Sequence, residues 1–370
     1  MKIVADERIP FIKNYFEDAG DLVLKPGRAM SPADVKDADM LVVRSITPVN
    51  EALLKGSRVK YVGSVTAGHD HLDTAWLDQA GIAWEVAEGF NAPPVADYVM
   101  CVVAALQRKQ LFQEKGMRVA VIGVGNVGQL VADRLKLLDF KVVTCDPLRA
   151  ASDPQFKSTT LSEIADCDLI TLHVPLTKAG THPTYHMIDK TFLSRQMPES
   201  ILLNTSRGSV INFDDLKKAG AHLYWCFDVW EHEPHIDKKI LERAMIASPH
   251  IAGYSLQSKI RGVDMIYQKA IEKKWIQPAQ LYKQEMPRQT LTFAGAKHHW
   301  QDMVLGVFNP LVMTAMMRNM LLPAESTGVL FDDLRHQFTY RHEFGFTSVS
   351  GATLANEDIR MLARLGMTLV

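Results

Sequence analysis

The sequence predicts an α/β protein with two doubly wound parallel sheets and a smaller C-terminal α+β module. Short apolar segments alternate with helical stretches through residues 1–92, and the alternation restarts at Met117 and continues to about residue 248. Strands separated by helices are typical of parallel sheets. Beyond Gln277 the pattern changes to strand-like LTF and FGFTSV segments around a methionine-rich apolar stretch at 303–322. This change of pattern indicates a separate module.

The expected elements follow in chain order. The first strands are KIVAD, MLVVRS, VKYVGSV and IAWEVA, after which Pro93 and Pro94 can open a largely apolar helix. The second series is the strand that starts at Met117, then DLITLHV, SILLNTS, LYWCFDVW and MIAS, followed by a helix over about 256–275. We therefore expect a first domain at 1–92 and 257–280, a second domain at 93–256 and a C-terminal domain at 281–370.

Length and charge exclude several classes of protein. The chain of 370 residues suits two or three domains, and its formal net charge of −1 gives no basic field for nucleic acid. No run approaches the roughly 18 apolar residues of a membrane span. The start, MKIVADERIP, lacks the apolar region of a secretory signal. We expect no nucleic-acid partner, no membrane partner and a cytoplasmic location.

The cysteines agree with this expectation. Cys101, Cys145, Cys167 and Cys226 occur singly, mostly in apolar segments, with no C-x-x-C pair. They are typical of buried free thiols in a reducing compartment.

Residues 117–146, MRVAVIGVGNVGQLVADRLKLLDFKVVTCD, carry the strongest functional signal. Gly123, Gly125 and Gly128 fit G-x-G-x-x-G, which allows a tight turn, a close approach of backbone to a diphosphate and close packing of helix on sheet. The diphosphate would sit at the start of the helix that begins near Asn126 and Val127, where free N–H groups favour an anion. A carboxylate 18 residues after Gly128 would bind the ribose hydroxyls and repel a 2′-phosphate. With Asp146 as that carboxylate, the segment predicts NAD as the cofactor.

Further candidates follow the other predicted strands, because open α/β sheets bind ligands at the carboxyl ends of their strands. This rule selects Ser45, Thr66, Asp146, Arg207, Asp228, Glu233 and His250. Arg207, Glu233 and His250 form a complete chemical set. An arginine can bind a carboxylate through two N–H groups. A histidine can take a hydroxyl proton, and a carboxylate can orient the imidazole. Glu231, His232 and His235 compete for the same roles, but of the three histidines only His250 ends a predicted strand.

The strings GVGNVG, HVPLT, NTSRGSVI, DVWEHEP and SPHIAGY resemble, in order, the motifs of the D-isomer-specific 2-hydroxyacid dehydrogenases. The resemblance implies a flavodoxin-like substrate domain and a Rossmann NAD domain, with Arg207, Glu233 and His250 as catalytic residues. It also implies that Asp228 holds the nicotinamide carboxamide. The further residues implied to line the nicotinamide are Val174, Thr205, Ser206, Arg207 and Gly253. Val174 replaces a threonine of the family pattern, which affects only a side-chain contact.

VVRSITPVNEALL, YVGSVTAGHDHLD, HIAGYSLQSKIRG and the C-terminal module resemble one branch of that family. This narrower likeness implies a small phosphorylated 2-hydroxy acid as substrate, held by Ser45, Thr66 and Tyr254, and a homodimer formed through the C-terminal domain. Arg44 could bind the substrate phosphate or be a solvated residue at a strand end.

Other interpretations have less support. GHDHLD could be a metal site through His69, His71 and Asp73, but hydride transfer needs no metal and Asp73 can cap a helix. We expect no metal, and we expect His298 and His299 to be surface or interface residues. The alternatives are a phosphoglycerate or hydroxypyruvate dehydrogenase, or a non-catalytic NAD-sensing corepressor.

Overall fold

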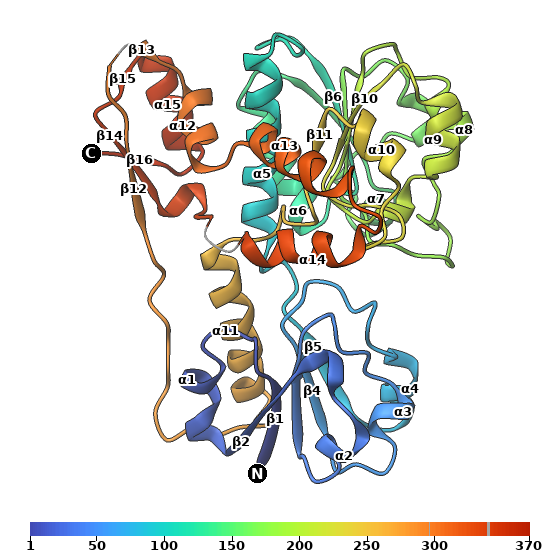
Figure 1. Ribbon diagram of the computed structural model, residues 1–370, viewed down its shortest axis with the longest axis vertical. Helices are drawn as coiled ribbons and strands as arrows, with labels where there is room; N and C mark the ends of the chain where they lie inside the picture. Colours follow the sequence, from blue (N-terminus) through green and yellow to red (C-terminus); the bar gives the residue numbers. More distant parts are fainter. Residues whose placement is uncertain (296, 339–340) are drawn as a thin grey trace. The chain divides into compact units, whose positions relative to one another are not determined.

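The computed structural model describes residues 1–295, 297–338 and 341–370, and the described chain divides into two compact units (Figure 1). Unit 1 comprises Met1–Asn91 and Leu256–Pro287, and unit 2 comprises Ala92–Ser255 and Arg288–Val370. The predicted α/β class with doubly wound parallel sheets is confirmed. The division into three domains remains a prediction.

Unit 1 holds a parallel sheet of five strands in the order β2-β1-β3-β4-β5. The strands are β1 (Lys2–Asp6), β2 (Asp21–Lys25), β3 (Met40–Val43), β4 (Tyr61–Ser64) and β5 (Ala83–Val86), and the helices are α1 (Ile12–Phe16), α2 (Pro32–Val35), α3 (Glu51–Leu54), α4 (Thr74–Gln79) and α11 (Leu256–Glu272). Successive residues of β1 belong to different clusters of buried hydrophobic side chains. Ile3 and Ala5 pack in one cluster, and Val4 packs in another. Both faces of the sheet are therefore covered, as in doubly wound folds.

Unit 2 holds a second parallel sheet in the order β11-β10-β9-β8-β6-β7. Its strands are β6 (Arg118–Ile122), β7 (Lys141–Cys145), β8 (Leu169–Leu172), β9 (Ile201–Asn204), β10 (Tyr224–Phe227) and β11 (Ile246–Ala247), and its helices are α5 (Ala92–Arg108), α6 (Asn126–Lys136), α7 (Pro147–Ser152), α8 (Lys190–Leu193), α9 (Phe213–Ala219) and α10 (Lys238–Arg243). The chain leaves β6 toward β7 on one side and later returns to β8 on the other side. This reversal is the switch point where such sheets bind ligands.

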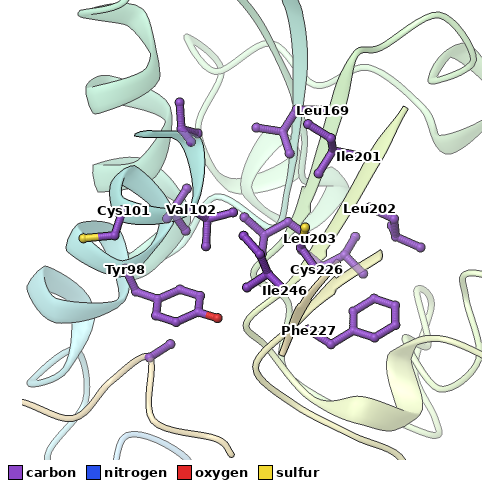
Figure 2. Packing of buried hydrophobic residues seen from close by; sticks show 14 of the residues in the cluster. Tyr98, Cys101, Val102, Leu169, Ile201, Leu202, Leu203, Cys226, Phe227 and Ile246 are labelled. Carbon is purple, nitrogen blue, oxygen red and sulfur yellow. The ribbon is translucent and has the colours of Figure 1, made fainter. Parts of the chain in front are cut away.

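Helix α5 forms the centre of the core of unit 2. Its residues from Val95 to Leu106 are buried, because apolar side chains cover almost its whole surface. Figure 2 shows Tyr98 and Val102 of this helix beside Leu203 and Ile246 of the strands. Each of the four cysteines is a buried free thiol, as predicted.

The C-terminal segment of unit 2 adds two small parallel sheets, β12-β14-β16 and β13-β15. The strands are β12 (Gln289–Thr292), β13 (Lys297–His298), β14 (Thr347–Ser350), β15 (Thr353–Leu354) and β16 (Thr368–Leu369), and the helices are α12 (Trp300–Val307), α13 (Pro310–Leu321), α14 (Gly328–Gln337) and α15 (Asn356–Arg364). Helices α12 and α13 pack against α5 (Figure 1). Short 3-10 helices lie at Glu17–Ala19, Gly27–Ala29, Leu161–Glu163, Gly208–Val210 and Phe344–Phe346.

The methionine-rich stretch at 303–322, which forms most of α12 and α13, packs one face against the core of its own chain. Met303, Met313 and Met317 join the core of unit 2, whereas Val312 and Met316 on α13 remain 56% and 40% exposed. Within the described residues, no single helix is long and apolar enough to cross a membrane, although α12 and α13 together, bent by 42°, meet the same length and composition criteria.

Candidate active site

The glycine turn between β6 and α6 has the geometry that its sequence predicts. Gly123 adopts a left-handed conformation with φ of 83°, and a Cβ there would lie 2.7 Å from the His173 carbonyl carbon. A Cβ on Gly128 would clash with the Gly123 carbonyl oxygen, so only glycine allows α6 to pack this close. A Cβ on Gly125 would have no described atom within 4 Å, which suits a closely approaching ligand. Asn126 begins α6 at this point.

Asp146 joins the end of β7 to this turn. Its Oδ2 accepts a hydrogen bond from the Val124 N–H at 2.8 Å, and its Oδ1 accepts one from the Arg149 N–H at 2.9 Å. A carboxylate oxygen can accept two hydrogen bonds, so both oxygens keep capacity for ribose hydroxyls. Arg149 also donates to the Val124 carbonyl at 2.8 Å and thereby braces the turn. These residues fit a dinucleotide with free ribose hydroxyls.

The ends of β8 and β9 are tied together by a buried histidine. The two ring nitrogens of His173 lie 2.9 Å from Thr171 Oγ1 and 3.1 Å from Thr205 Oγ1. Burial lowers the pKa of His173 to about 3, so the ring is neutral and can act only as a hydrogen-bonding brace. Val174 packs next to Gly123. Val174 and Thr205 therefore lie along the same sheet edge as the glycine turn.

Asp228 supports the loop that carries His250. Its Oδ1 accepts hydrogen bonds from Ser248 Oγ at 2.6 Å and the Ile251 N–H at 2.8 Å, and its Oδ2 accepts one from the Ala252 N–H at 2.9 Å. Burial raises the pKa of Asp228 above its ordinary value, against the opposing effects of the His250 charge and these hydrogen bonds. Oδ2 of Asp228 accepts one hydrogen bond and keeps capacity for a second, and the predicted contact of Asp228 with a carboxamide remains a prediction.

His250 and Glu233 form a pair. His250 Nδ1 lies 2.7 Å from Glu233 Oε2, and Glu233 Oε1 accepts the Trp230 N–H at 2.8 Å. His250 itself has a left-handed backbone with φ of 57°, held by a 2.7 Å hydrogen bond from its N–H to the Asp228 carbonyl. A non-glycine residue in this region is uncommon and needs such support. The support fixes the direction of the imidazole.

The electrostatics of the pair favour an ionised glutamate. Burial raises the pKa of Glu233, but the His250 charge, the hydrogen bonds from His250 and Trp230, and the charge of Arg335 outweigh it. The pKa of Glu233 therefore lies below its ordinary value. An ionised Glu233 can accept a hydrogen bond from Nδ1–H of His250, and this leaves Nε2 unprotonated and able to accept a proton.

The competing carboxylate Glu231 has a different partner. Glu231 Oε1 lies 2.6 Å from His186 Nε2, so Glu231 is engaged with a loop histidine. His232 and His235 are exposed, and neither forms the pair with Glu233.

Arg207 follows β9 directly and lies on an ordered loop. The Asn204 side chain donates to the Arg207 carbonyl at 2.9 Å and accepts from the Ser206 N–H at 2.9 Å. A Cβ on the next residue, Gly208, would clash with the Trp230 carbonyl group. This close backbone contact joins the Arg207 loop to the Trp230–Glu233 turn, so Arg207, Glu233 and His250 belong to one edge of the sheet.

The candidate substrate residues of unit 1 also end strands. Thr66 Oγ1 lies 2.7 Å from Ser64 Oγ and donates to the Gly68 carbonyl at 2.8 Å, and Ser45 is exposed after β3. Arg44 donates from Nε and Nη2 to the buried carboxylate of Asp6 at 2.8 and 3.2 Å. Two of its five N–H donors are thus used within the unit.

Two other sequence interpretations concern histidines and metals. Asp73 caps α4 by accepting the Trp76 N–H at 3.1 Å, as predicted, and His71 lies 2.8 Å from Ser64 Oγ. His298 and His299 lie at the start of α12, near Asp302 and Asp358. In the part of the chain that the structure describes, no three His, Cys, Asp or Glu side chains are grouped to hold a metal.

Three residues near these sites were not selected from the sequence. His173 braces Thr205, and Arg335 of α14 donates from Nη2 to Tyr254 Oη at 3.0 Å. In unit 1, burial and the positive charge of Arg44 lower the pKa of Lys259. The position of His173 in the HVPLT string, at the end of a predicted strand, is a sequence signal that could identify it. No such signal identifies Arg335 or Lys259, since neither residue follows a strand.

A family model and curated relatives match this architecture. The D-isomer specific 2-hydroxyacid dehydrogenase, NAD binding domain, matches residues 102–252. Erythronate-4-phosphate dehydrogenase of Coxiella burnetii is 42% identical over 347 residues, which are 93% of each chain. The chain belongs to the family of the erythronate-4-phosphate dehydrogenases, within the D-isomer specific 2-hydroxyacid dehydrogenases. It is thus an NAD-dependent oxidoreductase, and its matched residues form the NAD-binding domain.

Further comparisons agree with this assignment. Erythronate-4-phosphate dehydrogenase of Pseudomonas aeruginosa is 37% identical over the whole of both chains. D-lactate dehydrogenase of Aquifex aeolicus, solved with NAD and lactic acid, has a TM-score of 0.60 and 26% identity, covering 74% of this chain and 96% of that one. NAD-bound 3-phosphoglycerate dehydrogenase of Entamoeba histolytica has a TM-score of 0.61 at 23% identity and supports the fold alone; it covers 74% of this chain and 95% of that one.

The lowered pKa of Glu233 leads to a pH-dependent stability. A carboxyl group whose pKa is lower in the folded than in the unfolded protein stabilises the fold above the unfolded pKa and loses this effect as pH falls through the folded pKa. Glu233→Gln should therefore lower the free energy of unfolding at pH 7 by about 1–3 kcal/mol. This difference in the free energy of unfolding between the variant and the unsubstituted protein should shrink as the pH falls below the ordinary pKa of glutamate. Urea unfolding at several pH values would measure it. The exposed Glu242→Gln on α10 is the control, and an equal pH dependence in both variants would contradict the prediction.

Proposed function

We propose that this chain oxidises 4-phospho-D-erythronate at C2 with NAD, giving 2-oxo-3-hydroxy-4-phosphobutanoate for pyridoxal 5′-phosphate (vitamin B6) biosynthesis. The observation that carries the proposal is the 42% identity to an erythronate-4-phosphate dehydrogenase over 93% of both chains. The pairing of His250 with Glu233 at the edge of the NAD-binding sheet supports it, because alcohol oxidation needs a base for the hydroxyl proton.

In this proposal His250 accepts the C2 hydroxyl proton at Nε2. Its Nδ1–H donates to Glu233, which fixes the tautomer and stabilises the imidazolium that forms. NAD, when bound, supplies the acceptor for the hydride that leaves C2. The alcohol thus loses one hydride and one proton and becomes a ketone, and His250 later releases the proton to water.

Arg207 holds the substrate carboxylate in this mechanism. A guanidinium fork binds a planar carboxylate in a defined orientation, which places C2 and its hydroxyl relative to the base. The close contact between Gly208 and Trp230 supports this role, because it keeps the Arg207 loop in register with the turn that carries Glu233. Glycine turn residues and Asp146 would hold the cofactor, and Gly253 and Thr205 would line its nicotinamide end.

In unit 1 we propose that Ser45, Thr66 and Arg44 contact the substrate, with Arg44 near its phosphate. The nearby Lys259 adds a second cation, and two cations beside each other are stabilised by a dianion. In unit 2, Tyr254 would supply a hydroxyl to the substrate. Lys259 is an addition to the set expected from the sequence.

The alternatives have less support. A phosphoglycerate or hydroxypyruvate dehydrogenase would use the same catalytic residues, but the two curated relatives described above, which match 93% and 100% of this chain, are erythronate-4-phosphate dehydrogenases. A corepressor would bind NAD without needing the pair of Glu233 and His250. Turnover separates this last possibility from the proposal.

We further propose a cytoplasmic homodimer. Val312 and Met316 lie one turn apart on the exposed side of α13, and Val329 on α14 is 75% exposed. Exposed apolar side chains at helical spacing favour a second surface, and two-fold dimers are the commonest oligomers.

The substrate assignment predicts that the terminal phosphate dominates selectivity. NADH formation, followed by absorbance across 2-hydroxy acids with and without phosphate, should favour 4-phosphoerythronate over erythronate by about 30-fold to 150-fold in kcat/KM. Arg44→Gln and Lys259→Gln should each narrow that ratio, because each removes a cation. Equal efficiency on both acids would reject the phosphorylated substrate and leave the family assignment intact.

The role of His250 predicts a loss of chemistry without a loss of cofactor. His250→Ala should lower turnover by about 10² to 10⁴ while leaving the Kd for NAD, measured by calorimetry, nearly unchanged. His232→Ala is the matched control because this exposed histidine lies two residues after Trp230 and outside the pair. Near-normal turnover in His250→Ala would assign the base to another residue.

The dimer proposal predicts an effect of charge on α13. The unsubstituted chain at micromolar concentration should have the mass of a dimer by light scattering. Val312→Glu combined with Met316→Glu should give a folded monomer, because two buried carboxylates would oppose association. Leu148→Glu, at a leucine that is 60% exposed on α7, is the control. A monomeric unsubstituted chain would refute the proposal.

A further inference from the structure

Helix α14 is anchored to the chain segment that follows Glu233. Thr327, which precedes the helix, accepts a hydrogen bond from the Ile236 N–H at 3.0 Å and donates to the Pro234 carbonyl at 3.2 Å. A Cβ on Gly328 would lie 2.6 Å from the ring of His235, so the first turn of α14 lies directly against this segment. The start of α14 is therefore fixed relative to the Glu233 turn.

Near its other end, α14 presents Arg335 to the loop that follows His250. Arg335 Nη2 donates to Tyr254 Oη at 3.0 Å, and the guanidinium carbon lies 5.7 Å from the centre of the Tyr254 ring. Its Nη1 is 3.6 Å from Asp332 Oδ1, too long for a hydrogen bond. Its Nε is buried and has no hydrogen-bond partner among the residues that the structure describes.

Two other arginines of the same segment show a different pattern. Arg341 donates to the carbonyls of Pro94, Ala252 and Tyr254, and Arg318 donates to the carbonyls of Leu241, Glu242 and Ala244. Both arginines join backbone segments. Arg335 instead donates its hydrogen bond to a side-chain hydroxyl, and its charge lowers the pKa of Glu233. This contrast separates Arg335 from the structural cations.

Burial raises the pKa of Glu233, but the imidazole of His250, the N–H of Trp230 and the guanidinium of Arg335 each lower it. Arg335 is the permanent cation of the three, because a guanidinium stays protonated at every working pH. Glu233 therefore keeps an electrostatic support when His250 is neutral.

We propose that Arg335 is a positioning residue of the active site, which holds the hydroxyl of Tyr254 and places a permanent positive charge beside the turn that carries Glu233. The part that concerns Tyr254 rests on the proposed function, since Tyr254 is there assigned to the substrate. The part that concerns Glu233 does not depend on the substrate. The C-terminal segment thus takes part in catalysis within its own chain.

The first test is kinetic and uses the full-length protein with NAD and 4-phosphoerythronate. Arg335→Gln and Tyr254→Phe should each lower kcat/KM by about tenfold, and the double variant should lose less than the product of the two losses. Arg335→Lys should recover part of the activity because it restores the charge. Arg318→Gln should keep kcat/KM within about twofold, since its contacts are structural. Fully additive losses in the double variant would overturn the link through Tyr254.

The second test needs no substrate. Protein labelled with ¹³C at the glutamate carboxyl carbons gives a signal for Glu233 that is identified by its absence in Glu233→Gln. Its titration midpoint should move to higher pH in Arg335→Gln and should not move in Arg318→Gln, with folding checked by circular dichroism at each pH. An unmoved midpoint in Arg335→Gln would overturn the electrostatic role. If 4-phosphoerythronate gave no turnover at all, the proposed function would fail while this titration still decided the role of Arg335.

Discussion

The site depends on the hydrogen bonds that the buried carboxylate of Asp228 accepts from the loop after β11. The carboxylate accepts the N–H groups of Ile251 and Ala252 and the hydroxyl of Ser248, and the Asp228 carbonyl accepts the N–H of His250. These bonds hold the loop after β11 in a turn that no regular element provides. Removing the carboxylate would leave two buried N–H groups without acceptors, at about 1–3 kcal/mol each. The orientation of the imidazole is thus set by a residue that does not touch it.

The local parts of the site could be predicted from the sequence. The glycine at 128 has a steric requirement set by the carbonyl of Gly123 in the same turn, and the carboxylate at Asp146 follows from the length of a strand–helix–strand unit. His250 was selected because it ends a strand, and the structure pairs it with Glu233. In each case, the information lies within a few tens of residues.

The remaining parts depend on contacts between distant segments. The sequence favours Glu233 over Glu231 only through the family motif, whereas the structure gives Glu231 a partner of its own in His186, on a loop 45 residues earlier. Arg335 contacts Tyr254 across 81 residues of sequence. The sequence shows that the methionine-rich stretch is apolar but not which of its side chains are buried. The structure buries Met313 and Met317 and exposes Val312 and Met316.

The left-handed backbone at His250 has an evolutionary consequence. Asparagine and glycine adopt positive φ more readily than most residues, so either could replace this histidine without backbone strain, and the fold would lose only the contact with Glu233. The Asp228 bonds to the following N–H groups would remain, and the glycine turn at the other strand would be unaffected. A single codon change could therefore convert the enzyme into a stable NAD-binding protein without turnover. Loss of catalysis and loss of structure are separable at this position, which gives a short route from an enzyme to a sensor.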